Sequence, residues 1–531
     1  MRGADLLVKA LANAGVDTIF TLSGNQIMPI FDACIDAGIE VVHVRHEGAA
    51  VYMAEGYAQV TGRLGVALVT AAPGFGNAVG SIYMARMSES PVLLLSGDSP
   101  RGLDGRGAFQ ELDQVAVSKG VSKWSYRPQR AAELGADIAT AVRTATTGRP
   151  GPVHLALPFD LLNEDVGDIE APPASQCQAA PCAPDPSALA SVFGALKGAA
   201  KPIVLTGPLL NNTRTQGRLG ALEEALDAPV IAMESPRGLN DPSLGQIKSV
   251  LNEADLVLSL GKNVDFTTGF GQSGPQTQSW IVIDPDEELV HRASRSLGSK
   301  LVQSVQASAR TTFEQMLSTP AGASARGEWR ARVHELISAR APQQPTATDL
   351  MHPADLCAAL QPMIDAAEDP ILIIDGGEFG QWAQACLSGP ARLINGPSGA
   401  IGGCLCYAAA AKVARPDSTV FLLMGDGTAG FHFSEFDTAA RHSANFVAII
   451  GHDSQWNAEV QIQMRDYGEN RLLGCELAET RYDMAAKGLG AHGEWVEKVE
   501  DLEPAMNRSL ASGKPACIAV KIEGVAAPSG H

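Results

Sequence analysis

Several features that would assign this chain to a special class are absent from its 531 residues. No stretch approaches the run of about 18 apolar residues that spans a membrane. Acidic residues outnumber basic ones, 59 to 40, and the net charge of −19 argues against the basic face that a nucleic-acid backbone requires. We therefore expect neither a membrane nor a nucleic acid as a partner.

Paired cysteines are absent as well. The nine cysteines are dispersed and odd in number, without C-x-x-C spacing, so reduced thiols are expected. The segment MRGADLLVKALANAGVDTIF at the start has helical apolar spacing with internal charges, unlike a signal peptide. These features predict a soluble, cytoplasmic protein.

What the chain does contain is a regular alternation of strand-length apolar runs, such as SPVLLLSGD and STVFLLMGDG, with helical patterns. The alternation predicts an α/β fold of parallel sheets with helical crossovers. Stretches at 164–189 and 319–353 have the composition of linkers, the second around a charged helical piece. We therefore expect three domains, 1–165, 185–325 and 350–525. The first and third share one strand–turn–helix–strand rhythm, which predicts two related domains around a different middle one.

The strongest chemical pattern lies in the third domain, where MGDG (424–427) and GHDSQWN (451–457) each end a strand pattern. Asp426 and Asp453 are 27 residues apart, the length of one strand–helix–strand crossover. Parallel strands place both carboxylates at the same sheet edge, where open α/β folds bind ligands. Two carboxylates with backbone carbonyls suit Mg²⁺ or Ca²⁺, and the glycines let a diphosphate approach the backbone. The alternative is that GDG forms only a turn.

These residues resemble the diphosphate-binding motif of thiamine-diphosphate enzymes. Further segments at 44–79, 107–115, 147–158 and 395–403 are similar to the acetolactate synthase and benzaldehyde lyase branch, in order along nearly the whole chain. The resemblance implies a pyrimidine-binding domain and a diphosphate-binding domain, each a doubly wound parallel sheet, flanking a Rossmann-like middle domain. It also implies thiamine diphosphate and Mg²⁺ as cofactors.

Glu47, in RHEGAA, matches the glutamate that hydrogen-bonds the cofactor's aminopyrimidine ring. A carboxyl there favours the imino tautomer, whose imine removes the weakly acidic C2 proton. Without the resemblance, Glu47 would be interpreted as an acidic residue favoured at a helix N-terminus.

The other cofactor residues are implied by the same resemblance. Ile401 matches the bulky residue that holds the cofactor bent, and the carbonyl of Gly399 accepts a bond from the aminopyrimidine. The carbonyl of Gln455 is the third metal ligand beside Asp426 and Asp453. The remaining residues expected around the cofactor are Gly376, Gly377, Gln381, Gly425, Gly427, Thr428 and Trp456.

On the substrate side, Gln110 matches a glutamine that faces the substrate, and Asn25 and Gln26 fall where relatives place substrate-shaping residues. Benzaldehyde lyase has a histidine at the position of Gln26, and an amide can only hydrogen-bond. Acetolactate synthases carry tryptophan where Ile462 stands, which puts true acetolactate synthesis in doubt. The GFGQSG string beginning at Gly269 is interpreted as a chance match to a dinucleotide motif.

These observations predict a C–C lyase or carboligase that acts on 2-keto acids, 2-hydroxy ketones or aldehydes. A 2-hydroxyacyl-CoA lyase or a 2-keto acid decarboxylase remains an alternative within the superfamily. A flavin-linked oxidoreductase and a catalytically silent binding module are alternatives of other classes. Glu47 and the metal ligands lie in different domains, and one cofactor bridges two subunits in relatives, so a homodimer or homotetramer is expected.

Overall fold

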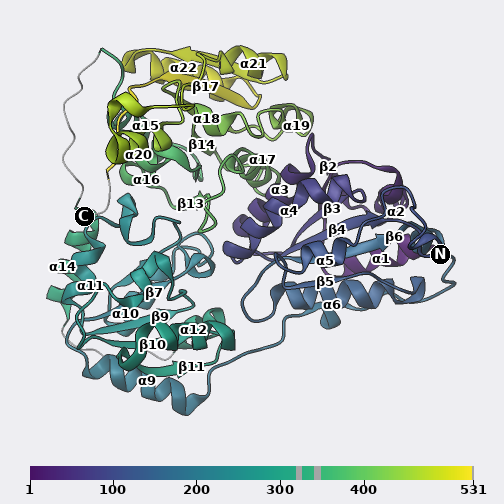
Figure 1. Cartoon of the computed structure of the whole chain (residues 1–531), viewed down its shortest axis with the longest axis horizontal. Helices are drawn as coiled ribbons and strands as arrows, with labels where there is room; N and C mark the ends of the chain where they lie inside the picture. Colours follow the sequence, from purple (N-terminus) through teal and green to yellow (C-terminus); the bar gives the residue numbers. More distant parts are fainter. Residues whose placement is uncertain (319–325, 340–348, 529–531) are drawn as a thin grey trace. The chain divides into compact units, whose positions relative to one another are not determined.

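The computed structural model describes residues 1–318, 326–339 and 349–528 (Figure 1). The chain divides into two compact units. The first comprises Met1–Ala180, Leu405–Pro416 and His432–Asn445, and the second comprises Pro181–Cys404, Asp417–Phe431 and Phe446–His531.

The first unit contains a six-stranded parallel sheet of order β2-β1-β3-β4-β6-β5. β3 and β4 are buried at every position, as expected for a parallel sheet covered on both faces. The strands are β1 Thr18–Thr21, β2 Glu40–His43, β3 Gly65–Val69, β4 Val92–Asp98, β5 Trp124–Tyr126 and β6 Val153–Pro158.

Helices within residues 1–180 pack on this sheet (Figure 1, purple to blue). Residues of α1, α2 and α6 share one buried apolar cluster with the strands, whereas α3 packs against α4. The helices are α1 Gly3–Asn13, α2 Met28–Ala37, α3 Glu47–Thr61, α4 Pro73–Met87, α5 Gln114–Ser118, α6 Leu134–Thr146, α7 Phe159–Asn163, α8 Ala174–Cys177, α17 Cys404–Ala414 (from Leu405) and α19 Glu435–Arg441.

The second unit contains two parallel sheets. The five-stranded sheet has the order β11-β10-β9-β7-β8, and the six-stranded sheet has the order β13-β12-β14-β15-β17-β16. Their strands are β7 Pro202–Thr206, β8 Val230–Ala232, β9 Leu256–Leu260, β10 Ser279–Ile283, β11 Leu301–Val305, β12 Ile371–Ile374, β13 Ala391–Ile394, β14 Val420–Gly425, β15 Val447–His452, β16 His492–Val496 and β17 Ala516–Lys521.

The helices of the second unit connect these strands. They are α9 Pro186–Gly198, α10 Leu219–Leu226, α11 Ile247–Glu253, α12 Glu287–Leu297, α13 Ala309–Ser318, α14 Gly327–Ser338, α15 Pro353–Asp365, α16 Gly377–Cys386, α18 Asp426–Ala429, α20 Asn457–Tyr467, α21 Tyr482–Gly488 and α22 Leu502–Ala511. The charged helical piece predicted inside the second linker is confirmed as α14, while residues 319–325 and 340–348 of that linker lie outside the described residues.

The two six-stranded sheets have the same topology. Numbered within each sheet, both follow the order 2-1-3-4-6-5. In both, the order reverses between the first and third strands, which is where open α/β sheets bind ligands beyond the carboxyl ends of the strands. The predicted α/β fold with parallel sheets is therefore confirmed. The domain boundaries 1–165, 185–325 and 350–525 remain a prediction.

We predict that Asp137 makes stability depend on pH. Burial, and then the charge of Glu133, raise the pKa of this half-buried carboxyl on α6 from 3.8 to about 6. The folded protein thus holds a proton that the unfolded chain has already released, so the free energy of unfolding falls as pH rises from 3.8 to about 6. Asp137→Asn should raise the melting temperature above pH 6 and leave it unchanged below pH 3.8 in thermal unfolding. Identical pH profiles for the two proteins would contradict this assignment.

Candidate functional site

A cavity of about 300 Å³ opens at the carboxyl edge of the six-stranded sheet of the second unit, the third sheet in chain order, where β12, β14 and β15 end. Gly425 pairs with Gly451 in register, so Asp426 and Asp453 leave neighbouring strands at the same edge. Both aspartates line the cavity. The sequence pattern therefore correctly predicted that these two carboxylates would meet.

Backbone bonds fix the orientation of both aspartates. Oδ1 of Asp426 accepts the Gly427 N–H at 2.9 Å, and its Oδ2 accepts the Ser454 N–H at 2.9 Å. Oδ1 of Asp453 accepts the Gln455 N–H at 3.2 Å. Burial, and then the negative charge of Asp453, raise the pKa of Asp426 to about 7, and burial raises that of Asp453 to about 6. Two desolvated carboxylates that repel each other are the donor set that a divalent cation stabilises.

No group of three or more His, Cys, Asp or Glu side chains within residues 1–318, 326–339 and 349–528 is placed to hold a metal. A cation at the Asp426–Asp453 pair would therefore take its other ligands from backbone and phosphate oxygens, which are the ligands that Mg²⁺ prefers. Gln455, whose carbonyl the resemblance implies as a ligand, lines the same cavity.

Glycines leave room in the cavity for a phosphate group. A Cβ on Gly425 would meet nothing within 4 Å, and Gly377, at φ +84°, has its nearest neighbour at 3.6 Å. Gly427 is different, because a Cβ there would lie 2.8 Å from the Trp456 ring. The predicted residues Gly376, Gly399, Gln381, Ile401 and Thr428 also line this cavity.

The loop that carries Gly399 and Ile401 is tied to β12 by Asp375, a residue to which the sequence assigned no role. Its buried carboxylate accepts N–H groups from Gly376 at 2.6 Å and from Gly402 at 3.0 Å. Burial nevertheless raises the pKa of Asp375 to about 6. Asp375 thereby holds two cavity-lining turns together.

The sequence interpretation missed several cavity-lining residues, among them Arg237, Glu378 and Gln384. Arg237 reaches the rim from the segment after β8, and Glu378 and Gln384 lie on α16. Gln384 is 4% exposed, and its Oε1 has no hydrogen-bond partner among the described residues. No motif identifies these residues, because only the fold of the second unit brings the segment at 235–237 to the edge of the third sheet.

Glu47 lies in the first unit, at the first position of the buried helix α3. The side chain of His46 caps this helix by accepting the Gly48 N–H at 3.0 Å. Glu47 Oε2 accepts a bond from Asn77 Nδ2 at 2.9 Å, and Oε1 lies 3.4 Å from where a Cβ on Gly74 would stand. The carboxylate is therefore oriented by side chains as well as by the helix start.

The structure brings two of the predicted substrate-side residues together in the first unit. Thr70 Oγ1 donates to Gln26 Oε1 at 2.7 Å, and Gln26 Nε2 donates to Gln110 Oε1 at 2.8 Å. Gln26 is 6% exposed. Asn25 begins the short 3₁₀ helix η1, Asn25–Ile27, and is exposed.

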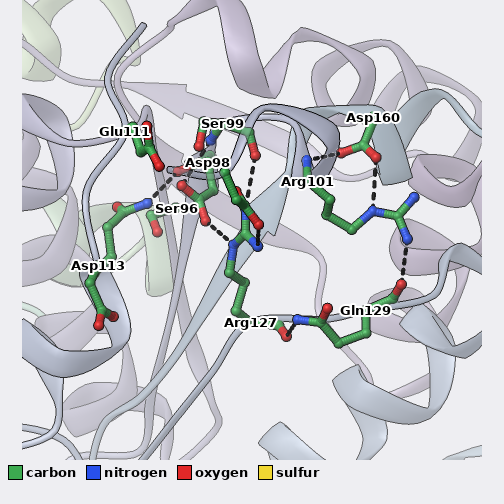
Figure 2. Close-up of polar contacts among 12 residues, drawn as sticks. Ser96, Asp98, Ser99, Arg101, Glu111, Asp113, Arg127, Gln129 and Asp160 are labelled. Atoms are coloured by element: carbon green, nitrogen blue, oxygen red, sulfur yellow. Dashed lines mark hydrogen bonds and ion pairs between the residues drawn. The ribbon is translucent and has the colours of Figure 1, made fainter. Parts of the chain in front are cut away.

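The segment that carries Gln110 is held by a polar cluster at the end of β4 (Figure 2). Glu111 accepts N–H groups from Gly105 at 2.5 Å and from Gly107 at 2.9 Å. Arg127 bridges Asp98 and Asp104 at the base of the same segment. These bonds stabilise Gln110 in a left-handed conformation, at φ +59°.

Two further expectations can be placed. Ile462 lies on α20 and is 45% exposed. The GFGQSG string overlaps η7, a 3₁₀ segment at Phe266–Gly271 in which Gly269 and Phe270 are left-handed. The segment does not form the strand–turn–helix of a dinucleotide motif. In the part of the chain that the structure describes, no helix is both long and apolar enough to span a bilayer.

Doubly wound sheets with glycine-rich turns and paired carboxylates at the carboxyl edge are typical of α/β proteins that bind a phosphorylated cofactor with a cation. Two family descriptions match the chain: thiamine pyrophosphate enzyme, N-terminal TPP binding domain, at residues 1–117, and thiamine pyrophosphate enzyme, C-terminal TPP binding domain, at residues 375–520.

Curated relatives match over nearly the full length. The chain is 31% identical to the acetolactate synthase large subunit IlvG of Mycobacterium tuberculosis, over 98% of this chain and 95% of that protein. It is 30% identical to the catabolic acetolactate synthase of Raoultella terrigena over the same shares. It is also 30% identical to 2-hydroxyacyl-CoA lyase 2 of Bos taurus, over 92% of this chain and 84% of that protein.

The chain therefore belongs to the thiamine pyrophosphate enzyme family. It is a thiamine-diphosphate-dependent enzyme of the lyase and carboligase type, in the branch of the acetolactate synthases and 2-hydroxyacyl-CoA lyases.

We predict that Asp426→Ala weakens Mg²⁺ and thiamine diphosphate binding together, because the ion would bridge the carboxylates and the diphosphate. The loss should exceed the roughly 10- to 100-fold that removal of an outer-shell partner costs. Asp453→Asn is the matched control with a milder expected loss, since Asn keeps an oxygen ligand. Calorimetric titration measures both affinities, and unchanged cofactor binding in Asp426→Ala would contradict the site.

Proposed function

We propose that this protein is a thiamine-diphosphate- and Mg²⁺-dependent enzyme that breaks or forms the C–C bond next to a carbonyl, in 2-keto acids, 2-hydroxy ketones and aldehydes. The observation that carries this proposal is the pair of carboxylates, the buried Asp426 and the partly buried Asp453, in a cavity that glycine turns leave open. Family membership supports the cofactor, and the carboxylate pair supports the metal.

Asp426, Asp453 and the carbonyl of Gln455 would hold the cation, and the turns at Gly377 and Gly425 would receive the diphosphate. Ile401 suits the role of the residue that keeps the cofactor bent, since its Cγ2 lies 2.7 Å from where a Cβ on Gly376 would stand. Ile401 is thus wedged against the β12 turn. Thiamine diphosphate, when bound there, would supply a nucleophilic carbon and an electron sink for breaking or forming the C–C bond next to a carbonyl.

Glu47 would hold the proton shared with a ring nitrogen of the cofactor. Its bond from Asn77 Nδ2 leaves Oε1 available, and Gly74 keeps the space beside that oxygen open. A carboxylate with one oxygen fixed and the other free is suited to moving a proton along one direction.

The Gln26–Gln110 pair would orient the substrate by hydrogen bonds, because neither amide ionises at neutral pH. The Thr70 hydroxyl donates to Gln26 Oε1 and thereby fixes the orientation of this amide. Gln26 Nε2 then points toward Gln110 Oε1 and donates to it. Gln110 Nε2 then remains to donate to a substrate oxygen. We therefore assign proton transfers to Glu47 and the cofactor rather than to the substrate-side residues.

A 2-hydroxyacyl-CoA lyase activity is the second candidate. Arg237 lies on the cavity rim beside Glu378 and is exposed, and no bond to its guanidinium joins it to another described residue. An exposed guanidinium at the mouth of a cavity suits the anionic group of a ligand, which the phosphates of a CoA thioester would provide.

We further propose a homodimer, paired or not into a tetramer, with each cofactor held by two subunits. Glu47 and the two aspartates belong to different compact units of one chain, which is compatible with a site shared between copies. Small molecules are the expected substrates.

We predict that Glu47→Gln separates cofactor binding from activation. The variant should bind thiamine diphosphate normally, because the phosphate and metal contacts lie elsewhere. C2 proton exchange and turnover should both fall by about 10²- to 10⁴-fold, the usual contribution of an acid–base group. Deuterium exchange at C2, followed by NMR after acid quench, measures this rate. Asp137→Asn, in which a carboxylate on another helix is neutralised, is the control and should exchange at the wild-type rate. If Glu47→Gln exchanged the C2 proton at the wild-type rate, the proposed role in activation would be wrong, and Glu47 would serve only at the start of α3.

The proposed reaction class is tested by a donor–acceptor screen with Mg²⁺ and thiamine diphosphate, read by mass spectrometry. Keto acids, hydroxy ketones, aldehydes and 2-hydroxyacyl-CoA thioesters form the donor set, and each active donor is repeated with Arg237→Ala. Turnover of CoA thioesters alone, lost in Arg237→Ala, would establish the second candidate. Turnover of none of these donors would contradict the proposed reaction class.

A further inference from the structure

Two of the nine cysteines, Cys357 and Cys386, contact each other, although no motif in the sequence predicts that they pair. Cys357 lies on α15 and Cys386 is the last residue of α16, and their side chains are hydrogen-bonded. Cys357 is fully buried within the core of the third sheet, whereas Cys386 is exposed. One thiol of the pair is therefore open to solvent, and the other lies directly behind it.

A second set of contacts fixes the distance between the two helices at this point. Gln361 lies one turn after Cys357 on α15. Its Nε2 donates to the Ser388 carbonyl at 3.1 Å, and its Oε1 accepts the Ser388 N–H at 2.9 Å. Ser388 follows Cys386 by two residues, so this two-way amide contact holds the thiols side by side. Leu356 and Leu360, both 0% exposed, anchor α15 beneath them.

We propose that Cys357 and Cys386 form a reversible oxidation site that closes to a disulfide when a small-molecule disulfide, such as oxidised glutathione, reacts with it. Cys386 Sγ loses its proton and attacks one sulfur of the oxidant, and one thiolate leaves. Cys357 Sγ then loses its proton and attacks Cys386 Sγ, and the second thiolate leaves. Two protons and two electrons pass from the protein to the oxidant, which departs as two thiols.

The order of the two steps follows from exposure and from acidity. Only Cys386 is accessible to a solute. The hydrogen bond to Cys386, and then burial, raise the pKa of the Cys357 thiol well above its ordinary value of 9.0, so Cys357 reacts second. A disulfide needs a sulfur separation of about 2.05 Å, which two thiols already in contact reach by a small movement of the helix end.

The exposed cysteine of the oxidation site, Cys386, lies on α16, and this helix also lines the cofactor cavity. Gly377, Gln381 and Gln384 are cavity residues on α16, and Gln384 precedes Cys386 by two residues. Drawing the two sulfurs together shifts the end of this ten-residue helix relative to α15. We expect the shift to reach the cavity and to weaken cofactor binding. This link, unlike the oxidation itself, rests on the proposed function.

Peptide mass spectrometry tests the oxidation. Trypsin releases residues 341–392 as one peptide that holds Cys357 and Cys386 and no other cysteine. After treatment of the full chain with oxidised glutathione and blocking of free thiols under denaturing conditions, this peptide should carry neither label and should lack two hydrogens. Dithiothreitol should restore both labelling sites.

Variants make the assignment specific. Cys386→Ser, at an exposed position that folding tolerates, should leave Cys357 labelled, and Cys182→Ser, at a partly exposed cysteine elsewhere, should behave as wild type. Labelling of both cysteines in the treated wild type, or a glutathione adduct on Cys386 that never closes, would overturn the proposal without any variant.

Calorimetry with thiamine diphosphate and Mg²⁺ tests the link to the cavity. Oxidised wild type should bind about tenfold more weakly than reduced wild type, the lower end of what disturbing the surroundings of a metal site costs. Cys386→Ser should bind equally in both conditions. Equal affinity of oxidised and reduced wild type would overturn the link. The peptide result does not depend on the cofactor, so failure of the proposed function would leave the oxidation site standing.

Discussion

The structure depends above all on one electrostatic constraint, the burial of two like charges at a single sheet edge. Asp426 and Asp453 leave neighbouring strands side by side, and burial raises the pKa of both. The backbone bonds from Gly427, Ser454 and Gln455 orient the carboxylates but bring no positive charge. Such a pair is costly unless a cation balances it. The surrounding glycines leave space for a diphosphate that would bind to this cation.

The same strand order occurs twice, and each copy places polar side chains beyond the carboxyl ends of its strands. In each six-stranded sheet the first and third strands diverge into loops at their carboxyl ends. One sheet presents Asp426 after β14, its third strand, beside Asp453 after the neighbouring β15, and the other presents the Gln26 turn after β1 and Thr70 after β3. The two sheets differ in the side chains that follow their strands. The first carries the amides Gln26 and Gln110 together with Glu47, and the third carries two carboxylates and open glycine turns.

Several contacts that shape the candidate site join residues that no local pattern connects. Asp375 ties the turn after β12 to the loop at Gly402. Cys386 lies on α16, the helix that carries Gln384, and contacts Cys357 on α15. A substitution on α15 can therefore influence the cavity through packing alone, because close-packed interiors transmit small displacements.

The sequence by itself determined the fold class, the family and the meeting of Asp426 with Asp453. Parallel strands separated by one crossover must end at the same edge, so the spacing of two motifs was sufficient. Only the tertiary structure decided which side chains from distant segments lie near these two aspartates or contact one another elsewhere. The arrival of Arg237 at the cavity rim, the bond between Gln26 and Gln110, and the contact of two dispersed cysteines depend on how helices and loops pack. Such packing contacts follow no period in the sequence, because they are set by the summed shape of many side chains rather than by any local pattern.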